Sequence, residues 1–147
     1  MSGAILLVED NDDDAELTTM AFREARVFNP IVRLEDGVEA LDYLFGRGKH
    51  AGRSPADLPV VVLLDLKLPR LGGLEVLTAI REDARTRHLP VVILTSSVED
   101  ADRLAAYSSH ANSYVQKPVG YDRFVSAAQQ IGLYWMLLNV PPPRGPS

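Results

Sequence analysis

The stretch VVVLLDLKLP, residues 60 to 69, runs five apolar residues directly into a single carboxylate, that of Asp65. A short, continuous Val/Leu run bounded by a polar residue and a proline is typical of a strand that is buried on both faces, as in the middle of a parallel sheet. A buried helix is disfavoured because the run is short. In open α/β sheets the functional groups lie just beyond the carboxyl ends of the strands, so Asp65 stands where such a fold keeps its chemistry.

Strand-like and helix-like segments alternate on both sides of this stretch. Short apolar segments predict four more strands, at residues 4–8, 31–34, 91–94 and 113–116. Turn residues and helical spacing predict five helices, beginning near residues 12, 37, 73, 99 and 121, the last of them reaching residue 139. The alternation predicts an α/β fold, a flavodoxin-like doubly wound sheet of five parallel strands with right-handed crossovers and the strand order 2-1-3-4-5.

The first helix is expected to begin near Asp12, because acidic residues in the first turn complement the helix macrodipole. Asn29-Pro30 is expected to end it. Between these points, apolar residues recur at helical spacing. They predict a buried face made of Leu17, Met20, Ala21, Ala25 and Phe28.

Length and composition favour one ordinary domain. The chain has 147 residues, of which 46% are hydrophobic, enough to build a core without staples. We expect this domain to occupy residues 1–140. The prolines at 141–143 should end the last helix and leave residues 141–147 as an extended, proline-rich tail.

Charge and cysteine content exclude several classes of function. The absence of cysteine excludes disulfides, a thiol nucleophile and cysteine metal sites, and is compatible with a reducing compartment. The net charge of −5 and the lack of a basic run argue against nucleic acid as a partner. No stretch approaches the length of a membrane span or has the features of a signal peptide, so we expect a soluble cytoplasmic protein with no membrane partner.

Polar residues follow four of the five predicted strands: Glu9 and Asp10, then Asp65, then Thr95, then Lys117. In the expected topology these strand ends converge on one edge of the sheet. Three crowded carboxylates repel one another unless a cation neutralises them, and a hard divalent ion with oxygen ligands suits that role. The sequence therefore predicts a Mg²⁺ site.

The same set of residues suits phosphoryl transfer. A magnesium ion that keeps several waters leaves room for phosphate oxygens, and Lys117 and the Thr95 hydroxyl can hold the remaining ones. Asp65, at the centre, is placed to be the nucleophile that forms an acyl phosphate.

Each residue taken alone also has a plainer explanation. Acids before a helix usually cap it, Thr95 can simply begin a Ser/Thr turn, and Lys117-Pro118 can simply end a strand. Capping, however, does not require a lysine opposite three acids. The joint occurrence favours the phosphoryl-transfer hypothesis.

Four motifs lie at these strand ends: LVEDN at 7–11, LLDLKLP at 63–69 followed by Gly72-Gly73, ILTS at 93–96, and YVQKP at 114–118. In order and spacing they resemble the receiver domain of two-component response regulators, over nearly the whole chain. The resemblance implies that Asp65 accepts a phosphoryl group from a phosphohistidine of a sensor histidine kinase.

It also implies roles for the surrounding residues. Glu9, Asp10, Asp65 and the Lys67 backbone carbonyl would hold the magnesium, and Thr95 and Lys117 would contact the phosphoryl group. Tyr114 would be an aromatic switch that turns inward when Thr95 moves.

A narrower resemblance links the chain to the stand-alone regulators of bacterial phytochrome kinases. It rests on Asn11, the segment DAELT at 14–18, the segment NSY at 112–114, and Tyr134-Trp135 followed by prolines. Two positions depart from the commonest receiver pattern. Glu9 replaces an Asp, and Lys67 stands where phytochrome-type regulators often have Asn. Lys67 puts a flexible cation beside the site, and our hypothesis is that it tunes dephosphorylation.

The end of the last helix is apolar on every side. A core stripe does not account for Leu133, Tyr134, Met136 and Leu137, so this outer surface needs a partner of its own. We expect a homodimer through the last helix. The alternative is that the proline tail folds back over it.

Three functions fit these observations. The first is a single-domain response regulator, a signalling module and not an enzyme, switched by phosphorylation at Asp65. The second is a Mg²⁺ phosphatase of the haloacid dehalogenase kind. That family uses a second Asp, two residues after the nucleophile, as general acid, and this chain has Lys67 there, which argues against this function. The third is a receiver that acts as a scaffold without being phosphorylated, which the presence of Asp65, Thr95 and Lys117 argues against.

Overall fold

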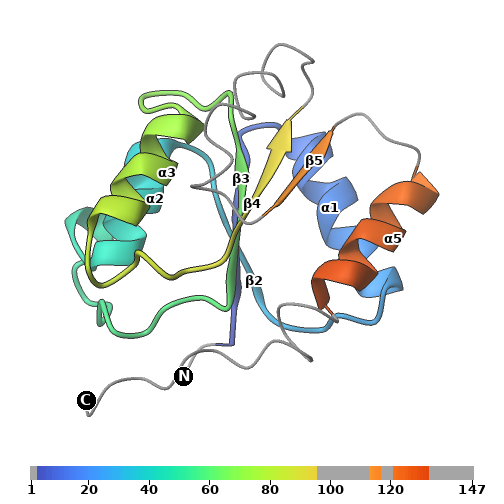
Figure 1. Cartoon of the computed structure of the whole chain (residues 1–147), viewed down its shortest axis with the longest axis horizontal. Helices are drawn as coiled ribbons and strands as arrows, with labels where there is room; N and C mark the ends of the chain where they lie inside the picture. Colours follow the sequence, from blue (N-terminus) through green and yellow to red (C-terminus); the bar gives the residue numbers. More distant parts are fainter. Residues whose placement is uncertain (1–2, 96–112, 117–120, 133–147) are drawn as a thin grey trace.

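A parallel sheet of five strands runs through the centre of the computed structural model, which describes residues 3–95, 113–116 and 121–132 (Figure 1). The strand order is β2-β1-β3-β4-β5, which confirms the predicted order. All four pairings between neighbouring strands are parallel. The strands are β1 (Ile5–Val8), β2 (Ile31–Leu34), β3 (Val61–Asp65), β4 (Val91–Thr95) and β5 (Ser113–Gln116).

Helices cover both faces of this sheet. On one side α1 packs beside α5, and on the other α2 packs beside α3 (Figure 1). Within the described ranges the helices are α1 (Asp12–Glu24), α2 (Gly37–Phe45), α3 (Gly73–Glu82) and α5 (Tyr121–Ile131), with a short 3₁₀ helix, η1 (Gly48–His50), after α2. The helix predicted to begin near residue 99 lies outside the described residues, as does the end of the last helix from residue 133 onward.

The two central strands explain why the sequence shows unbroken apolar runs. Every residue of β1, and residues 61–64 of β3, is at most 1% exposed. Because side chains alternate along a strand, Leu6 and Leu64 join the core under α2 and α3, whereas Leu7 and Leu63 join the core under α1 and α5. Packing on both faces therefore holds β1 and β3 in place, and with them the strand ends that carry the acids.

The helices that follow β1 and β2 begin at side-chain caps. The Asn11 carboxamide oxygen accepts a hydrogen bond from the Asp14 backbone N–H at 2.9 Å, and the Asp36 carboxylate accepts one from the Glu39 N–H at 2.7 Å. The predicted start of the first helix, near Asp12, is confirmed. Since Asn11 is the cap, Glu9 and Asp10 are not needed for that role.

The predicted buried face of α1 is only partly correct. Met20 and Phe28 are 51% and 68% exposed, whereas Phe22, which the prediction omitted, is buried. Thr18 is buried as well, because its hydroxyl donates to the Asp14 carbonyl and so needs no water. The residues of α1 that are buried are Ala15, Thr18, Ala21 and Phe22.

The end of α1 is also earlier than predicted. The helix stops at Glu24 because Arg26 adopts a left-handed conformation with φ 63°. The Val27 N–H then bonds to the Phe22 carbonyl and the Arg26 N–H to the Arg23 carbonyl, which is the Schellman pattern of a helix C-terminus. Phe28 therefore lies beyond the helix.

Among the described residues, no helix combines the length and the apolar character needed to cross a bilayer.

Candidate functional site

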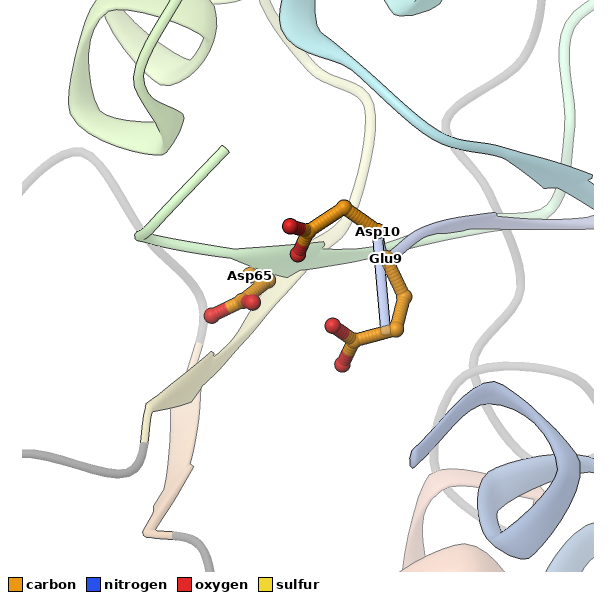
Figure 2. Close-up of side chains that lie close together, drawn as sticks. All are labelled: Glu9, Asp10 and Asp65. Atoms are coloured by element: carbon orange, nitrogen blue, oxygen red, sulfur yellow. The ribbon is translucent and has the colours of Figure 1, made fainter. Parts of the chain in front are cut away.

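The carboxylates of Glu9, Asp10 and Asp65 meet where β1 and β3 end (Figure 2). One oxygen from each lies within 4.8 Å of the others. The register accounts for this meeting, because Val8 pairs with Leu64 and the next residue on each strand is an acid. The structure thus brings together three of the residues that the strand order predicted to converge.

Glu9 is held in a closed environment. Its side chain is fully buried, and its carboxylate accepts a hydrogen bond from the Asn11 N–H at 3.3 Å. Its own N–H donates to the Leu34 carbonyl at 2.9 Å, which extends the pairing of β1 with β2 by one residue. Asp10, by contrast, is exposed to solvent.

Asp65 is 7% exposed at the last position of β3. Its carboxylate lies 3.4 Å from the Lys67 backbone N–H, a long hydrogen bond, and the Lys67 side chain is exposed. An exposed lysine two residues after the central carboxylate has the reach to approach any group bound there.

The turn after Asp65 depends on a glycine. A Cβ atom built on Gly73 would stand 2.2 Å from the Asp65 carbonyl oxygen, far inside contact distance. The Gly73 N–H donates to the Leu66 carbonyl at 3.0 Å, so the start of α3 is drawn tightly against the end of β3. The sequence marked Gly72-Gly73 as a turn, but this close approach could not be read from it.

The loop between β3 and α3 is also anchored to the start of α2. Arg70, with φ 67°, donates from Nη1 to the Asp36 carboxylate at 3.2 Å. A Cβ on Gly37 would stand 2.1 Å from the Leu71 carbonyl oxygen, so these two backbones are also in close contact. The sequence did not predict this link, because Arg70 and Asp36 are 34 positions apart along the chain.

The remaining predicted residues are placed only in part. Thr95 ends β4 directly after Leu94, which pairs with Asp65, so its backbone lies at the same edge of the sheet as the acids. Tyr114 lies in β5, paired with Ile93. The side chains of Thr95 and Tyr114 lie outside the described residues, as do the whole of Lys117 and residues Leu133, Tyr134, Met136 and Leu137.

The donor set fits a hard divalent cation. All three ligand groups are carboxylates, and Glu9 and Asp65 are buried, where like charges repel strongly. Oxygen ligands on two neighbouring strands, with the exposed Asp10 toward solvent, suit an ion that retains water, as Mg²⁺ and Mn²⁺ do.

The sequence is similar to those of known regulatory proteins. The chain is 44% identical over 138 residues to the probable methanogenesis regulatory protein FilR2 of Methanothrix harundinacea, covering 94% of this chain and 86% of FilR2. It is 33% identical over 132 residues to response regulator Rcp1 of Synechocystis, covering 90% and 88%.

Solved structures agree with these relatives. The bacteriophytochrome response regulator RtBRR superposes with a TM-score of 0.81 at 45% identity, over 97% of this chain and 86% of RtBRR. The Mn²⁺-bound form of Rcp1 superposes with a TM-score of 0.80 at 31% identity, over 95% and 98% of the two chains. The family model of the response regulator receiver domain matches residues 5–129. With its sheet order and its cluster of acids, the chain belongs to the response regulator receiver domain family.

Proposed function

We propose that this receiver is switched when a sensor histidine kinase transfers a phosphoryl group to Asp65. The observation that carries the proposal is the cluster of Glu9 and Asp10 around Asp65, a buried carboxylate at the end of the central strand (Figure 2). An aspartate in this position can act as a nucleophile once its negative neighbours are neutralised.

The reaction follows from the residues at the strand ends. A carboxylate oxygen of Asp65 forms a bond to phosphorus as the bond between phosphorus and the kinase histidine breaks, so the phosphoryl group is transferred without a net change in its atoms. Glu9, Asp10, Asp65 and the Lys67 carbonyl would hold a Mg²⁺ ion, which neutralises the charge that gathers on the phosphoryl oxygens. We assign Thr95 and Lys117 to the remaining phosphoryl oxygens and Tyr114 to the switch.

The test is to incubate the protein with Mg²⁺ and acetyl phosphate and to follow the intact mass. We expect stoichiometric labelling that is stable in acid and labile in base, and that is lost in Asp65→Asn. Continuous turnover of the phosphodonor would instead support a phosphatase, and no labelling would support a scaffold. Neither alternative is favoured, because receiver domains are signalling modules and position 67 lacks the second Asp of the phosphatases.

We further propose that the kinase is a bacterial phytochrome. The support is the similarity to RtBRR, a bacteriophytochrome response regulator, at 45% identity. A purified, autophosphorylated bacteriophytochrome kinase should transfer its label to this chain faster than a histidine kinase from an unrelated pathway does. Equal rates from both kinases would refute this pairing.

Lys67 is proposed to slow the loss of the phosphoryl group. Its side chain is exposed two residues after Asp65 and is long enough to bring its ammonium to a phosphoryl oxygen, where it would obstruct the attacking water. Such an ion pair is worth about 1 kcal/mol, so Lys67→Asn should speed the decay of the labelled protein about fivefold. Lys67→Arg, which keeps the charge, should decay at nearly the parental rate. Equal decay rates for the parent and Lys67→Asn would remove the hypothesis.

The proposed assembly is a homodimer of receiver domains spanning residues 1–140, followed by the tail at 141–147. Its support is the sequence of residues 133–138, in which every residue is apolar, so that the core stripe of a single helix would not include them all. We also propose a fifth helix, beginning near residue 99 between β4 and β5, and a cytoplasmic location, both as predicted from the sequence. Sedimentation should show a mass that rises with concentration toward a dimer, and Leu137→Glu should hold it at one chain. A parental mass of one chain at every concentration would refute the dimer.

A further inference from the structure

We infer that Arg33 is a positioning residue for the acidic site, because it fixes the turn that carries Glu9 and Asp10. The inference rests on the proposed function, in which those two residues help to hold a divalent cation. It concerns how the site is kept in shape, and it adds a residue from β2, a strand that contributes no ligand of its own.

The guanidinium of Arg33 spans the turn between β1 and α1. Arg33 lies on β2 opposite Leu7, and its side chain is only 28% exposed. Its Nε donates to the Glu9 carbonyl oxygen at 3.0 Å, and its Nη1 donates to the Asp12 carboxylate at 2.7 Å. One side chain therefore bonds to the residue immediately before Asp10, Glu9, and to the residue two positions after it, Asp12.

Arginine suits this task better than other cations. Its planar guanidinium presents donors in a fixed fork, so the bonds to the Glu9 carbonyl and to the Asp12 carboxylate, made together, fix these two groups relative to each other. The Glu9 peptide is also held on its N–H side by the Leu34 carbonyl, at 2.9 Å. With both sides held by β2, the turn leaves the Glu9 and Asp10 side chains little freedom to spread apart.

The contact with Asp12 has a second consequence. Asp12 is an acid two residues from Asp10, yet it is not among the three carboxylates that converge. Its carboxylate is instead paired with the Arg33 guanidinium, at 2.7 Å. Arg33 thereby separates the acid that begins α1 from the acids that form the site.

Charge and geometry make opposite predictions for the loss of Arg33. A cation near the site repels Mg²⁺, so its removal through charge alone should tighten binding. If Arg33 acts through geometry, its removal should weaken binding, as loss of a supporting contact behind metal ligands does by about 10- to 100-fold. We expect the geometric effect to be the larger one, and Mg²⁺ affinity therefore to fall, because solvent screens the charge of a partly exposed guanidinium.

The experiment is a calorimetric titration with Mg²⁺, repeated with Mn²⁺, on the full-length chain and its variants. Arg33→Met and Arg33→Lys should both bind about tenfold more weakly than the parent. Lysine keeps the charge but cannot make both bonds of the fork. Asp12→Asn removes the charge but keeps a side-chain oxygen that can accept from Arg33 Nη1, so both bonds of the fork remain possible and the variant should bind within about twofold of the parent.

Arg81→Met is the matched control. Arg81 is also partly buried and also makes two hydrogen bonds, in its case to the backbone carbonyls of Arg87 and Leu89, at the opposite end of the sheet. It should lose a comparable amount of thermal stability and keep the parental affinity for Mg²⁺. A loss of Mg²⁺ affinity in Arg81→Met equal to that in Arg33→Met would overturn the inference, because general destabilisation would then explain both.

Other results would also overturn it. Parental affinity in Arg33→Lys with tighter binding in Arg33→Met would mean that only charge matters, and unchanged affinity in both would mean that Arg33 has no role. Either failure leaves a parent that binds Mg²⁺ and is labelled at Asp65, whereas a parent that does neither would refute the proposed function itself. If Arg33→Met does not fold, Arg33→Lys and Arg33→Gln decide the question.

Discussion

Asp65→Asn is expected to lose phosphorylation and, without Mg²⁺, to unfold at a higher temperature than the parent. The phosphorylation rate should fall at least about a thousandfold, as expected when a nucleophile is removed. The stability should rise because three carboxylates lie within 4.8 Å, and two of them are buried. At that spacing a charge pair repels by about 1 to 3 kcal/mol, depending on the effective dielectric. Replacing one charge with an amide of the same shape relieves that repulsion.

Metal should reverse the order of stability. A site-specific cation at a hundred times its Kd stabilises the parent by about 2.7 kcal/mol, whereas the variant has lost a ligand and gains little. Thermal unfolding of both proteins, with and without Mg²⁺, measures this crossover. Asp13→Asn removes an exposed acid outside the trio and should leave both curves nearly parental. If Asp65→Asn is less stable than the parent without metal, crowded negative charge is not a property of this site.

Gly73→Ala is expected to cost about 3 kcal/mol of stability, a large effect for one methyl group. The new Cβ would stand 2.2 Å from the Asp65 carbonyl oxygen and 2.7 Å from the Leu66 Cα. Both neighbours are backbone atoms in or next to the central strand, so no side chain can rotate to make room. Either α3 must move outward or the end of β3 must bend, and the second response displaces Asp65 itself.

Urea unfolding of Gly73→Ala beside Gly52→Ala gives a matched comparison. A Cβ on Gly52 meets no atom within 4 Å, so that variant should stay within about 0.5 kcal/mol of the parent. The Gly73 variant should also label more slowly at Asp65 under conditions where it remains folded. Equal midpoints for the two variants would contradict the close packing of α3 on β3.

Burial explains which parts of the fold were predictable. The strands β1 and β3 are enclosed on both faces, so their sequences are unbroken apolar runs. Runs this short are typical of buried strands and too short for a buried helix. Once these two strands are neighbours, the acids that follow them must meet, as Glu9 and Asp65 do. The centre of the site was therefore readable from local patterns and one assumption about topology.

The end of α1 was not readable, for a specific reason. A helix that ends in a left-handed residue usually announces it with glycine, but here Arg26 holds that position. The preference for glycine is overridden because Val27 and Phe22 both pack in the core under α1 and α5, which stabilises the turn. Extrapolating the helix to Asn29-Pro30 consequently assigned Phe28 to a buried face that it does not join.

The supports of the site were not readable either. Arg33 looks like an ordinary polar residue on an edge strand, and Asp36 looks like an ordinary helix cap. Their contacts with Glu9 and Arg70 join segments that only the folded chain brings together. Local sequence patterns identify the residues that react or bind the ion, whereas the residues that hold them in position are found only in the folded structure.

The anchoring of the β3–α3 loop bears on how freely this protein can be recombined with its relatives. Arg70 needs the carboxylate of Asp36, and the Leu71 carbonyl needs the bare backbone of Gly37. A chimaera that imports residues 66–72 from another receiver therefore lacks the matching residues at 36 and 37, and the anchoring of the loop is lost. Exchanging residues 36–37 in the same step should restore it, so the two segments form one unit of exchange although α2, η1 and β3 lie between them along the chain.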